Sequence, residues 1–186
     1  KDVTANDGRK ALYTYATNGD LKTVKLPELT NLLEYSYDTR HRITSYKNHF
    51  GGITLTTYDS SGRANKQTDP FGHVLTFAYT SNSSTGEKQT IITQPNGTKN
   101  RDLYNKNNQL YALTHDYQGS QEGIITYEYN ATAHHPIKVT SPGGKSTYYT
   151  YDDNGNPLTI LNANNALTTT TYDAQGNLLT TTDALN

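Results

Sequence analysis

The chain has 186 residues, of which 32% are hydrophobic, with no Cys, Met or Trp and with 16 Tyr against three Phe. So small a hydrophobic fraction excludes a thick two-layer core, while a net charge of −1 and an aromatic content of 10% argue against intrinsic disorder. The near-neutral charge also excludes the basic footprint of a nucleic-acid binder, no apolar run is long enough for a membrane span, and the absence of cysteine excludes disulfides and zinc–thiolate sites.

The first predicted element is a β-hairpin. One strand ends at Tyr13-Thr14-Tyr15, Asn18-Gly19 supplies a tight turn, and residues 20–25 form the return strand. Residues 26–29 then turn the chain back. A helix competes over this segment, with Pro27 in its first turn and with Leu29, Leu32 and Leu33 at near-helical spacing. A strand over residues 32–37 is preferred, since it keeps the register of the units that follow.

The same plan of two strands and two turns continues along the chain. Tyr58-Asp59 leads into a turn that Gly62 closes, and the next turn is Asp69-Pro70-Phe71-Gly72, where proline presets φ and glycine relieves strain. Turns of the same kind recur at residues 94–97 and 141–144. Longer loops are expected at residues 81–87 and 116–123. The pattern predicts roughly 14 to 16 short antiparallel strands.

A recurring tyrosine sets the period of this plan. Successive copies lie 22, 21, 21, 25, 25, 22 and 21 residues apart, and they are Tyr15, Tyr37, Tyr58, Tyr79, Tyr104, Tyr129, Tyr151 and Tyr172. Self-similarity at a fixed period indicates a repeat protein, here a single array of about eight repeats over residues 1–186. The pattern is already running at both ends, so we expect a fragment of a longer protein. Strand edges near residues 3–8 and 178–186 then predict edge-to-edge self-association.

Alignment on the key tyrosine predicts a sheet with two different faces. Five of the eight units have an aromatic residue two positions earlier, and aliphatic residues recur four positions earlier. Because side chains alternate along a strand, these positions share one face with the tyrosine. The other face is richer in Thr, Ser, Lys and Asn.

The recurring motif Tyr-Asp-x-x-Gly-Asn-x-Leu, with Asp-Pro-x-Gly between copies, resembles the YD repeats of the Rhs family. Residues 151–158, 172–179, 58–62 and 69–72 carry the match most closely, and the periodicity extends it over nearly the whole chain. The units at Tyr15 and Tyr79 lack the aspartate, and the unit at Tyr37 lacks the glycine. The residues expected to build the structural repeat are Tyr37, Asp38, Tyr58, Asp59, Gly62, Gly72, Gly97, Gly144, Tyr151, Asp152, Gly155, Tyr172, Asp173 and Gly176.

The resemblance implies a fold and a function. In this family the repeats wind as a long β-sheet spiral that forms a hollow shell, which bacterial members use to enclose a toxic C-terminal domain. Wall-associated proteins of Gram-positive bacteria, Tc toxin shell components and animal teneurins are similar. An all-β fold is therefore expected: a repetitive antiparallel hairpin meander, in an open curved sheet that is a segment of a β-spiral shell. The implied partners are neighbouring repeats and an enclosed toxin domain, and the implied location is secreted or on the bacterial cell surface or wall.

Sites for metals, cofactors and catalysis are weakly indicated. Asp152, Asn154 and Asn156 have the spacing that begins a calcium loop, but the later glutamate is missing, so a hairpin turn is the preferred interpretation. Adjacent His134 and His135 point to opposite faces if they lie on a strand, which indicates a surface pair rather than a metal site. No nucleophile elbow, phosphate loop or Cys–His pair is present, so neither an enzyme nor a cofactor is expected.

Two function classes remain open. In the first, the chain is a structural stretch of shell wall, with its tyrosines buried against neighbouring strands. In the second, it is a carbohydrate or cell-wall polymer binding module, with its tyrosines exposed as flat rings beside hydrogen-bonding groups. The exposure and hydrogen bonding of the repeat tyrosines therefore discriminate between the two classes.

Overall fold

The computed structural model describes residues 1–130 and 134–184, and in these residues it contains 17 β-strands and no helix. The all-β fold predicted from the sequence is confirmed, and the segment for which helix and strand competed is strand β4 (Leu33–Tyr37). No helix among the described residues has the length and apolarity needed to cross a membrane.

The strands are short and follow one another with turns between them. In chain order they are β1 (Asp2–Thr4), β2 (Lys10–Tyr15), β3 (Leu21–Lys25), β4 (Leu33–Tyr37), β5 (Ile43–Lys47), β6 (Ile53–Tyr58), β7 (Ala64–Thr68), β8 (Val74–Ser81), β9 (Lys88–Thr93), β10 (Lys99–Tyr104), β11 (Leu110–His115), β12 (Gly123–Glu128), β13 (Lys138–Thr140), β14 (Ser146–Tyr151), β15 (Pro157–Leu161), β16 (Leu167–Tyr172) and β17 (Leu178–Thr182).

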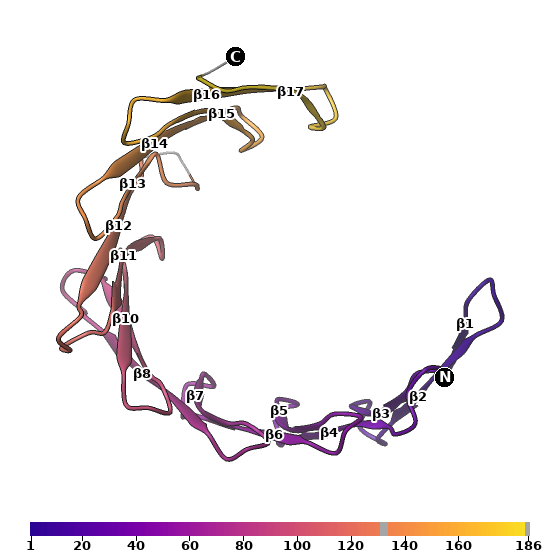
Figure 1. Ribbon diagram of the computed structural model, residues 1–186. Coiled ribbons are helices and arrows are strands. Elements are labelled where there is room, and N and C mark those ends of the chain that lie inside the picture. The colour runs from indigo at the N-terminus through magenta and orange to yellow at the C-terminus, as the bar shows by residue number, and fades with distance from the viewer. Residues whose placement is uncertain (131–133, 185–186) are drawn as a thin grey trace. The chain divides into compact units, whose positions relative to one another are not determined.

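The chain forms two compact units, residues 1–78 with 92–97, and residues 79–91 with 98–186. In the first unit each strand from β1 to β7 pairs antiparallel with the next, and β7 pairs with the start of β8 (Figure 1). In the second unit the strands from β10 to β17 pair antiparallel in the same way. Each unit is therefore a meander in which sequence neighbours are sheet neighbours.

The hairpins share one register. In every hairpin whose register is described between the key tyrosine and the return strand, the tyrosine faces the residue six positions later, as Tyr151 faces Pro157. The pairing then slips by one residue next to the tyrosine, as it does at Tyr15, Tyr37, Tyr58, Tyr104 and Tyr172. Such a β-bulge adds one residue to one strand and increases the local twist.

The two faces of the sheet differ in chemistry. On one face, hydroxyls pair across the hairpin, and the Oγ1 atoms of Thr14 and Thr23 lie 2.6 Å apart. The Thr171–Thr180 pair repeats this contact at 2.6 Å. On the other face aromatic rings meet, and the ring centroids of Tyr35 and Tyr46 lie 5.3 Å apart. The predicted division into an aromatic face and a hydroxyl-rich face is present in the structure.

Neither unit has a thick core. Among the described residues, only Val24, Ala112 and Thr114 are buried. The key tyrosines Tyr37 and Tyr58 are half-buried. A single sheet layer covers each residue only with its strand neighbours, so stability rests on cross-strand pairs and turn hydrogen bonds rather than on deep burial.

Two features differ from the sequence prediction. The strand count is 17 because β1, which precedes the first repeat, pairs with β2 and adds to the sixteen strands of eight hairpins. The loop after β11 is also held against the sheet: the Tyr117 N–H donates to the Lys99 carbonyl at 2.7 Å, and the Tyr117 ring lies 4.2 Å from the Arg101 guanidinium carbon. The sequence pattern predicts a loop at these residues but does not predict the contacts of Tyr117 with the sheet.

Candidate functional site

The repeat motif folds into a hairpin turn that an aspartate closes. In the copy at residues 151–156, the Asp152 N–H donates to the Asn156 carbonyl at 3.0 Å, and the Gly155 N–H donates to the Asp152 carbonyl at 3.1 Å. Gly155 has φ +86°, a left-handed conformation that glycine adopts without a steric penalty. The tight turn therefore needs glycine at the fifth position of the motif.

The aspartate side chain satisfies the turn's remaining backbone donors. Asp152 Oδ1 accepts hydrogen bonds from the N–H groups of Asn154 at 2.9 Å and Asn156 at 2.8 Å, while Oδ2 accepts from Asn156 Nδ2 at 2.9 Å. Asp173 repeats all three contacts with Gln175 and Asn177. The short carboxylate side chain at the first turn position accepts the hydrogen bonds of backbone N–H groups for which the turn offers no carbonyl acceptor.

The carboxylate geometry shifts the acidity of these residues. Hydrogen bonding by the Arg42 side chain lowers the pKa of Asp38 from 3.8 to about 2. The backbone N–H of Arg63 is the main cause that lowers the pKa of Asp59, and the side chains of Asn156 and Asn177 do the same for Asp152 and Asp173. These carboxylates are therefore acceptors fixed in the ionised form.

The tyrosine hydroxyl connects each repeat to the one before it. Tyr58 donates to the Ile43 carbonyl at 2.7 Å, and Tyr172 donates to the Pro157 carbonyl at 3.0 Å. Tyr129 and Tyr151 make the corresponding bonds, to Leu110 at 2.8 Å and to Pro136 at 3.0 Å. Because each acceptor lies at the start of the preceding return strand, or two residues before it in the case of Pro136, the hydroxyls join adjacent hairpins.

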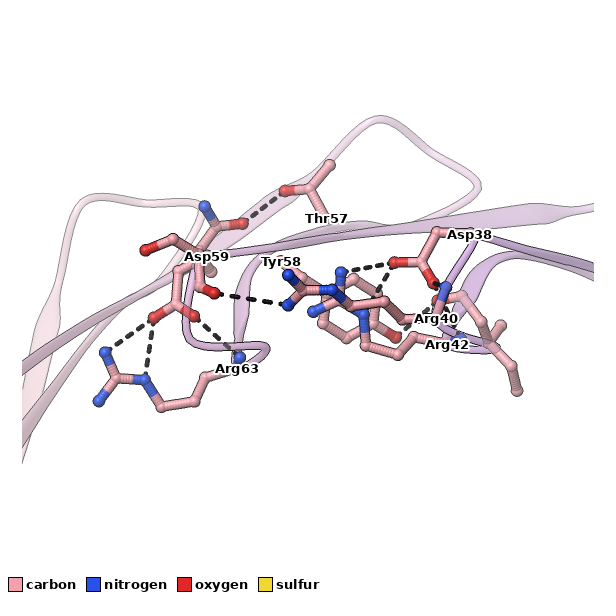
Figure 2. Close-up of polar contacts among 10 residues, drawn as sticks. Asp38, Arg40, Arg42, Thr57, Tyr58, Asp59 and Arg63 are labelled. Carbon is pink, nitrogen blue, oxygen red and sulfur yellow. Dashed lines mark hydrogen bonds and ion pairs between the residues drawn. The ribbon is translucent and has the colours of Figure 1, made fainter.

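An arginine joins the turn to the next tyrosine in the first unit (Figure 2). The Arg42 Nη2 atom lies 2.5 Å from Asp38 Oδ2, and its guanidinium carbon lies 4.2 Å from the centroid of the Tyr58 ring. One turn further on, Asp59 binds Arg63 with an Oδ2–Nη2 distance of 2.8 Å. The Asp38–Arg42 pair thus covers a face of the Tyr58 ring and extends the contact between two repeats.

The structure places the predicted repeat residues at strand ends and in the turns. The tyrosines end strands, and the aspartates begin turns. The glycines lie later in turns with φ between 75° and 88°, and they are Gly62, Gly72, Gly97, Gly144, Gly155 and Gly176. Asp38 and Tyr58 come together through Arg42, whereas the mid-repeat glycines Gly72 and Gly97 lie at the opposite ends of the strands from the tyrosine turns.

The sequence predicts mid-repeat turns such as residues 69–72, but it does not lead us to expect the side-chain caps that close them. Asn48 Oδ1 accepts from the N–H groups of Phe50 and Gly52, at 3.0 and 2.9 Å. Asp69 and Asn162 do the same in later mid-repeat turns. An Asp or Asn five positions before the first residue of the next repeat's first strand is the signal that finds these caps, as Asn48 precedes Ile53.

The residues weighed as metal ligands have other contacts. Asp152 is directed at N–H donors of its own turn, and the His135 ring centroid lies 5.2 Å from that of Tyr151. The described part of the chain holds no cluster of three or more His, Cys, Asp or Glu that could bind a metal ion. The arrangement therefore supports packing of one repeat on the next.

Comparison with known proteins gives both a local and a global match. A family model described as RHS Repeat matches residues 151–186. A search of curated proteins found no match.

Among solved structures, the chain superposes on TcdB2-TccC3 with a TM-score of 0.64 at 15% identity, over 98% of this chain and 11% of that chain. TcdB2-TccC3-Cdc42 gives a TM-score of 0.65 at 16% identity, with the same coverage of 98% and 11%. TcdB2-TccC3 without its hypervariable C-terminal region gives 0.64 at 16% identity, again covering 98% and 11%. This chain therefore spans about a tenth of the length of those chains. The resemblance to the Rhs family that the sequence indicates is confirmed: residues 151–186 carry an RHS repeat, and the chain has the fold seen in the TcdB2-TccC3 structures.

Proposed function

We propose that this chain is a structural segment of a secreted or surface-displayed Rhs/YD-repeat shell that encloses a C-terminal toxin domain and helps to deliver it. The tyrosine–carbonyl bonds between consecutive hairpins carry the proposal, since they fix one repeat to the next and use a hydroxyl that recurs in the motif for packing. The fold shared with TcdB2-TccC3 supports it. In this proposal the eight repeats form one array, and the partners are further repeats and the enclosed domain.

The segment has no catalytic activity of its own in this proposal. The aspartates that begin the turns are held ionised by donors of the same turn, so they lack the free geometry of a general acid or base. The repeat tyrosines with described hydroxyl bonds are likewise committed to backbone carbonyls. The proposed place of action is outside the bacterial cell, in the secreted medium or at the cell wall.

Protease protection in the longest natural chain that contains these residues tests the proposal. We expect the region following residue 186 to resist an added protease in the intact protein. Tyr172→Ala, which removes a ring and its bond to Pro157, should open the wall and expose that region, whereas Gly143→Ala should leave it protected. Equal cleavage of the following region in all three proteins, with the repeats still folded, would contradict enclosure.

Carbohydrate binding is the second candidate function. The observation in its favour is that the aromatic face is only half-covered and carries open hollows between consecutive hairpins. A segment of the shell could also bind a cell-wall polymer, since the tyrosines that pack the repeats together also present ring faces to a ligand.

A further inference from the structure

Two of the three phenylalanines of the chain lie at the tips of consecutive mid-repeat turns in the first unit. Phe50 is in the turn between β5 and β6, and Phe71 is in the turn between β7 and β8. They are 84% and 85% exposed, more than any other large hydrophobic residue in the described part of the chain. Rings so exposed contribute little to packing within the sheet, so the pair indicates a contact outside the unit.

The two turns lie side by side at one edge of the sheet. Because β6 pairs antiparallel with β7, the connection that precedes β6 and the connection that follows β7 are at the same end of the strands. A Cβ atom on Gly52 would lie 3.0 Å from the Cβ and Cγ atoms of Pro70, which shows how closely the turns approach. Phe50 and Phe71 therefore form one protruding apolar surface, here called the tip patch.

The backbone of each tip finds its hydrogen-bond partners within its own turn. Asn48 Oδ1 accepts from the N–H groups of Phe50 at 3.0 Å and Gly52 at 2.9 Å. Asp69 Oδ1 makes the two corresponding bonds, both at 2.8 Å, in the turn of Phe71. Such a tip enters a poorly hydrated region without the cost of unpaired donors. This property suits a lipid interface, which offers a backbone no fixed partners.

The charge of the tips indicates which kind of lipid surface they fit. The two turns, residues 48–52 and 69–73, contain no Lys or Arg. His73 Nδ1 lies 2.8 Å from Asp69 Oδ2, so the acid in these turns has a partner. Clusters of Lys and Arg are what anionic lipids attract. The tip patch is therefore suited to a bilayer surface of low net charge.

An open hollow of about 410 Å³ adjoins the turn of Phe50. Its lining includes Asn48 and Gly51 of that turn, together with the side chains of Glu34 and Lys47 from the neighbouring strands β4 and β5. The hollow thus places a polar, charged lining directly beside one of the two exposed rings.

The hollow presents one acid and one base on the face away from the repeat tyrosines. Glu34 lies opposite Lys47 in the register, and alternation along the strands puts both on the face opposite the Tyr35–Tyr46 pair. Lys47 Nζ lies 2.9 Å from Glu34 Oε1, and the two side chains are 41% and 48% exposed. An exposed ion pair is weak, so both groups can exchange partners with a ligand that carries one charge of each sign.

We propose that the tip patch and this hollow together form a docking surface for a zwitterionic bilayer of the phosphatidylcholine type. Phe50 and Phe71 enter the boundary between headgroups and acyl chains. A headgroup occupies the hollow, with its ammonium at Glu34 and its phosphate at Lys47. The contact lies in the interface and does not span the bilayer. It goes beyond the shell proposal and does not depend on it, because it uses residues of the first unit only.

Single-tryptophan variants test the proposal directly, because the chain contains no Trp. Phe50→Trp and Phe71→Trp place the fluorophore in the tip patch. Leu179→Trp is the matched control, since it places the fluorophore on a side chain of β17 that is 63% exposed and belongs to the second unit. With phosphatidylcholine vesicles we expect a saturable shift of the tip emission to shorter wavelength, and quenching by lipids brominated in their acyl chains. The Leu179→Trp emission should stay unchanged.

Vesicle sedimentation of the 186-residue chain measures the affinity. Phe50→Ala and Phe71→Ala should each reduce binding to phosphatidylcholine about tenfold, because each removes one ring from the interface. Glu34→Gln removes the acid that faces the ammonium. It should therefore lower binding to phosphatidylcholine vesicles and raise binding to phosphatidylglycerol vesicles.

The proposal is overturned if vesicles leave the tip emission unchanged in the folded chain. It is also overturned if they shift all three tryptophan variants equally, which would indicate nonspecific adsorption, or if the unsubstituted chain binds phosphatidylglycerol more tightly than phosphatidylcholine. A tip shift that follows protein concentration without lipid would overturn it too, and would assign the tip patch to contacts between copies of the chain.

Discussion

At the scale of single residues, the tyrosine hydroxyl is a test of how repeats hold together. Tyr172 is half-buried and donates to the Pro157 carbonyl at 3.0 Å. Tyr172→Phe keeps the ring and removes this bond, so we expect a loss of about 1 kcal/mol in the free energy of unfolding. Urea denaturation of the two proteins measures the difference.

Tyr15→Phe is the control for that measurement. The Tyr15 side chain is 50% exposed, and its hydroxyl makes no described hydrogen bond. The substitution should change the free energy of unfolding by less than about 0.5 kcal/mol. Equal losses in the two variants would mean that the hydroxyl bond to the preceding repeat contributes nothing.

The sequence predicts where the tyrosines lie but not what their hydroxyls bind. The 21-residue interval between Tyr151 and Tyr172 is sufficient to place both at strand ends on one face. The acceptor of the Tyr172 hydroxyl is a backbone carbonyl, which any residue type supplies. The bulge between Thr171 and Tyr172 recurs beside the other key tyrosines, but the repeat motif does not indicate which carbonyl the hydroxyl reaches.

At the scale of the turn, the ionised aspartates make stability depend on pH. Asp38 has a pKa of about 2 in the folded chain, against an ordinary value of 3.8. Because the folded-state pKa is the lower one, this stabilisation is fully present above about pH 4 and disappears as the pH falls through about 2. Asp59, Asp152 and Asp173, whose pKa values are lowered too, add in the same direction.

Urea midpoints between pH 5 and pH 2 measure this effect. We expect the midpoint to fall over about pH 4 to 2, and to fall less steeply in Asp38→Asn, which cannot ionise. Stability that is flat across this range, or an unchanged slope in the variant, would show that the Arg42 contact does not stabilise the ionised form in solution.

Alanine substitutions at two adjacent glycines of a mid-repeat turn test whether backbone conformation or steric crowding requires glycine there. Gly144 has φ +75° and Gly143 does not have a positive φ, and a Cβ atom at either position would meet nothing within 4 Å. Gly144→Ala should destabilise the chain by about 1 kcal/mol, because alanine is strained in the left-handed region. Gly143→Ala should be neutral or stabilise by up to about 1 kcal/mol, through a less flexible unfolded chain. Thermal unfolding of both variants distinguishes these effects, and a larger loss at Gly143 would contradict the assignment.

The turns were more predictable than the segments between them. An aspartate followed by a glycine three residues later determines the turn locally, so Asp152 and Gly155 could be identified from their spacing alone. Strand β1 carries no repeat motif and forms only because β2 offers it an edge. The contact of Tyr117 with Arg101 likewise joins residues 16 positions apart through the folded loop.

At the scale of the whole molecule, β1 and β17 each have only one described pairing partner, which leads us to expect association through these strands. The described registers give β1 one partner, β2, and give β17 one partner, β16. All residues of β1 and β17 are exposed, with Leu179 63% and Val3 51% exposed. Exposed strand edges with apolar side chains promote pairing between molecules. We expect oligomers whose population rises with protein concentration.

Light scattering over a concentration series measures this association. A variant with both Val3→Lys and Leu179→Lys places charge on the two edge strands and should shift the chain toward the monomer. Lys22→Glu, which changes a charge on β3, is the control and should leave association as it is. A strict monomer up to millimolar concentration would contradict edge pairing.

The tyrosine–carbonyl bonds also give the array a polarity. Each described bond runs from a later hairpin to an earlier one, as from Tyr172 to Pro157 and from Tyr58 to Ile43. When a hairpin leaves the ribosome, the carbonyl that accepts its tyrosine hydroxyl has therefore already been synthesised. The earlier hairpin needs no group from the later one to make its own tyrosine bond. During synthesis from the N-terminus, the acceptor of each described bond is therefore made before its donor. Each hairpin can form its tyrosine bond as soon as it folds onto the hairpin before it.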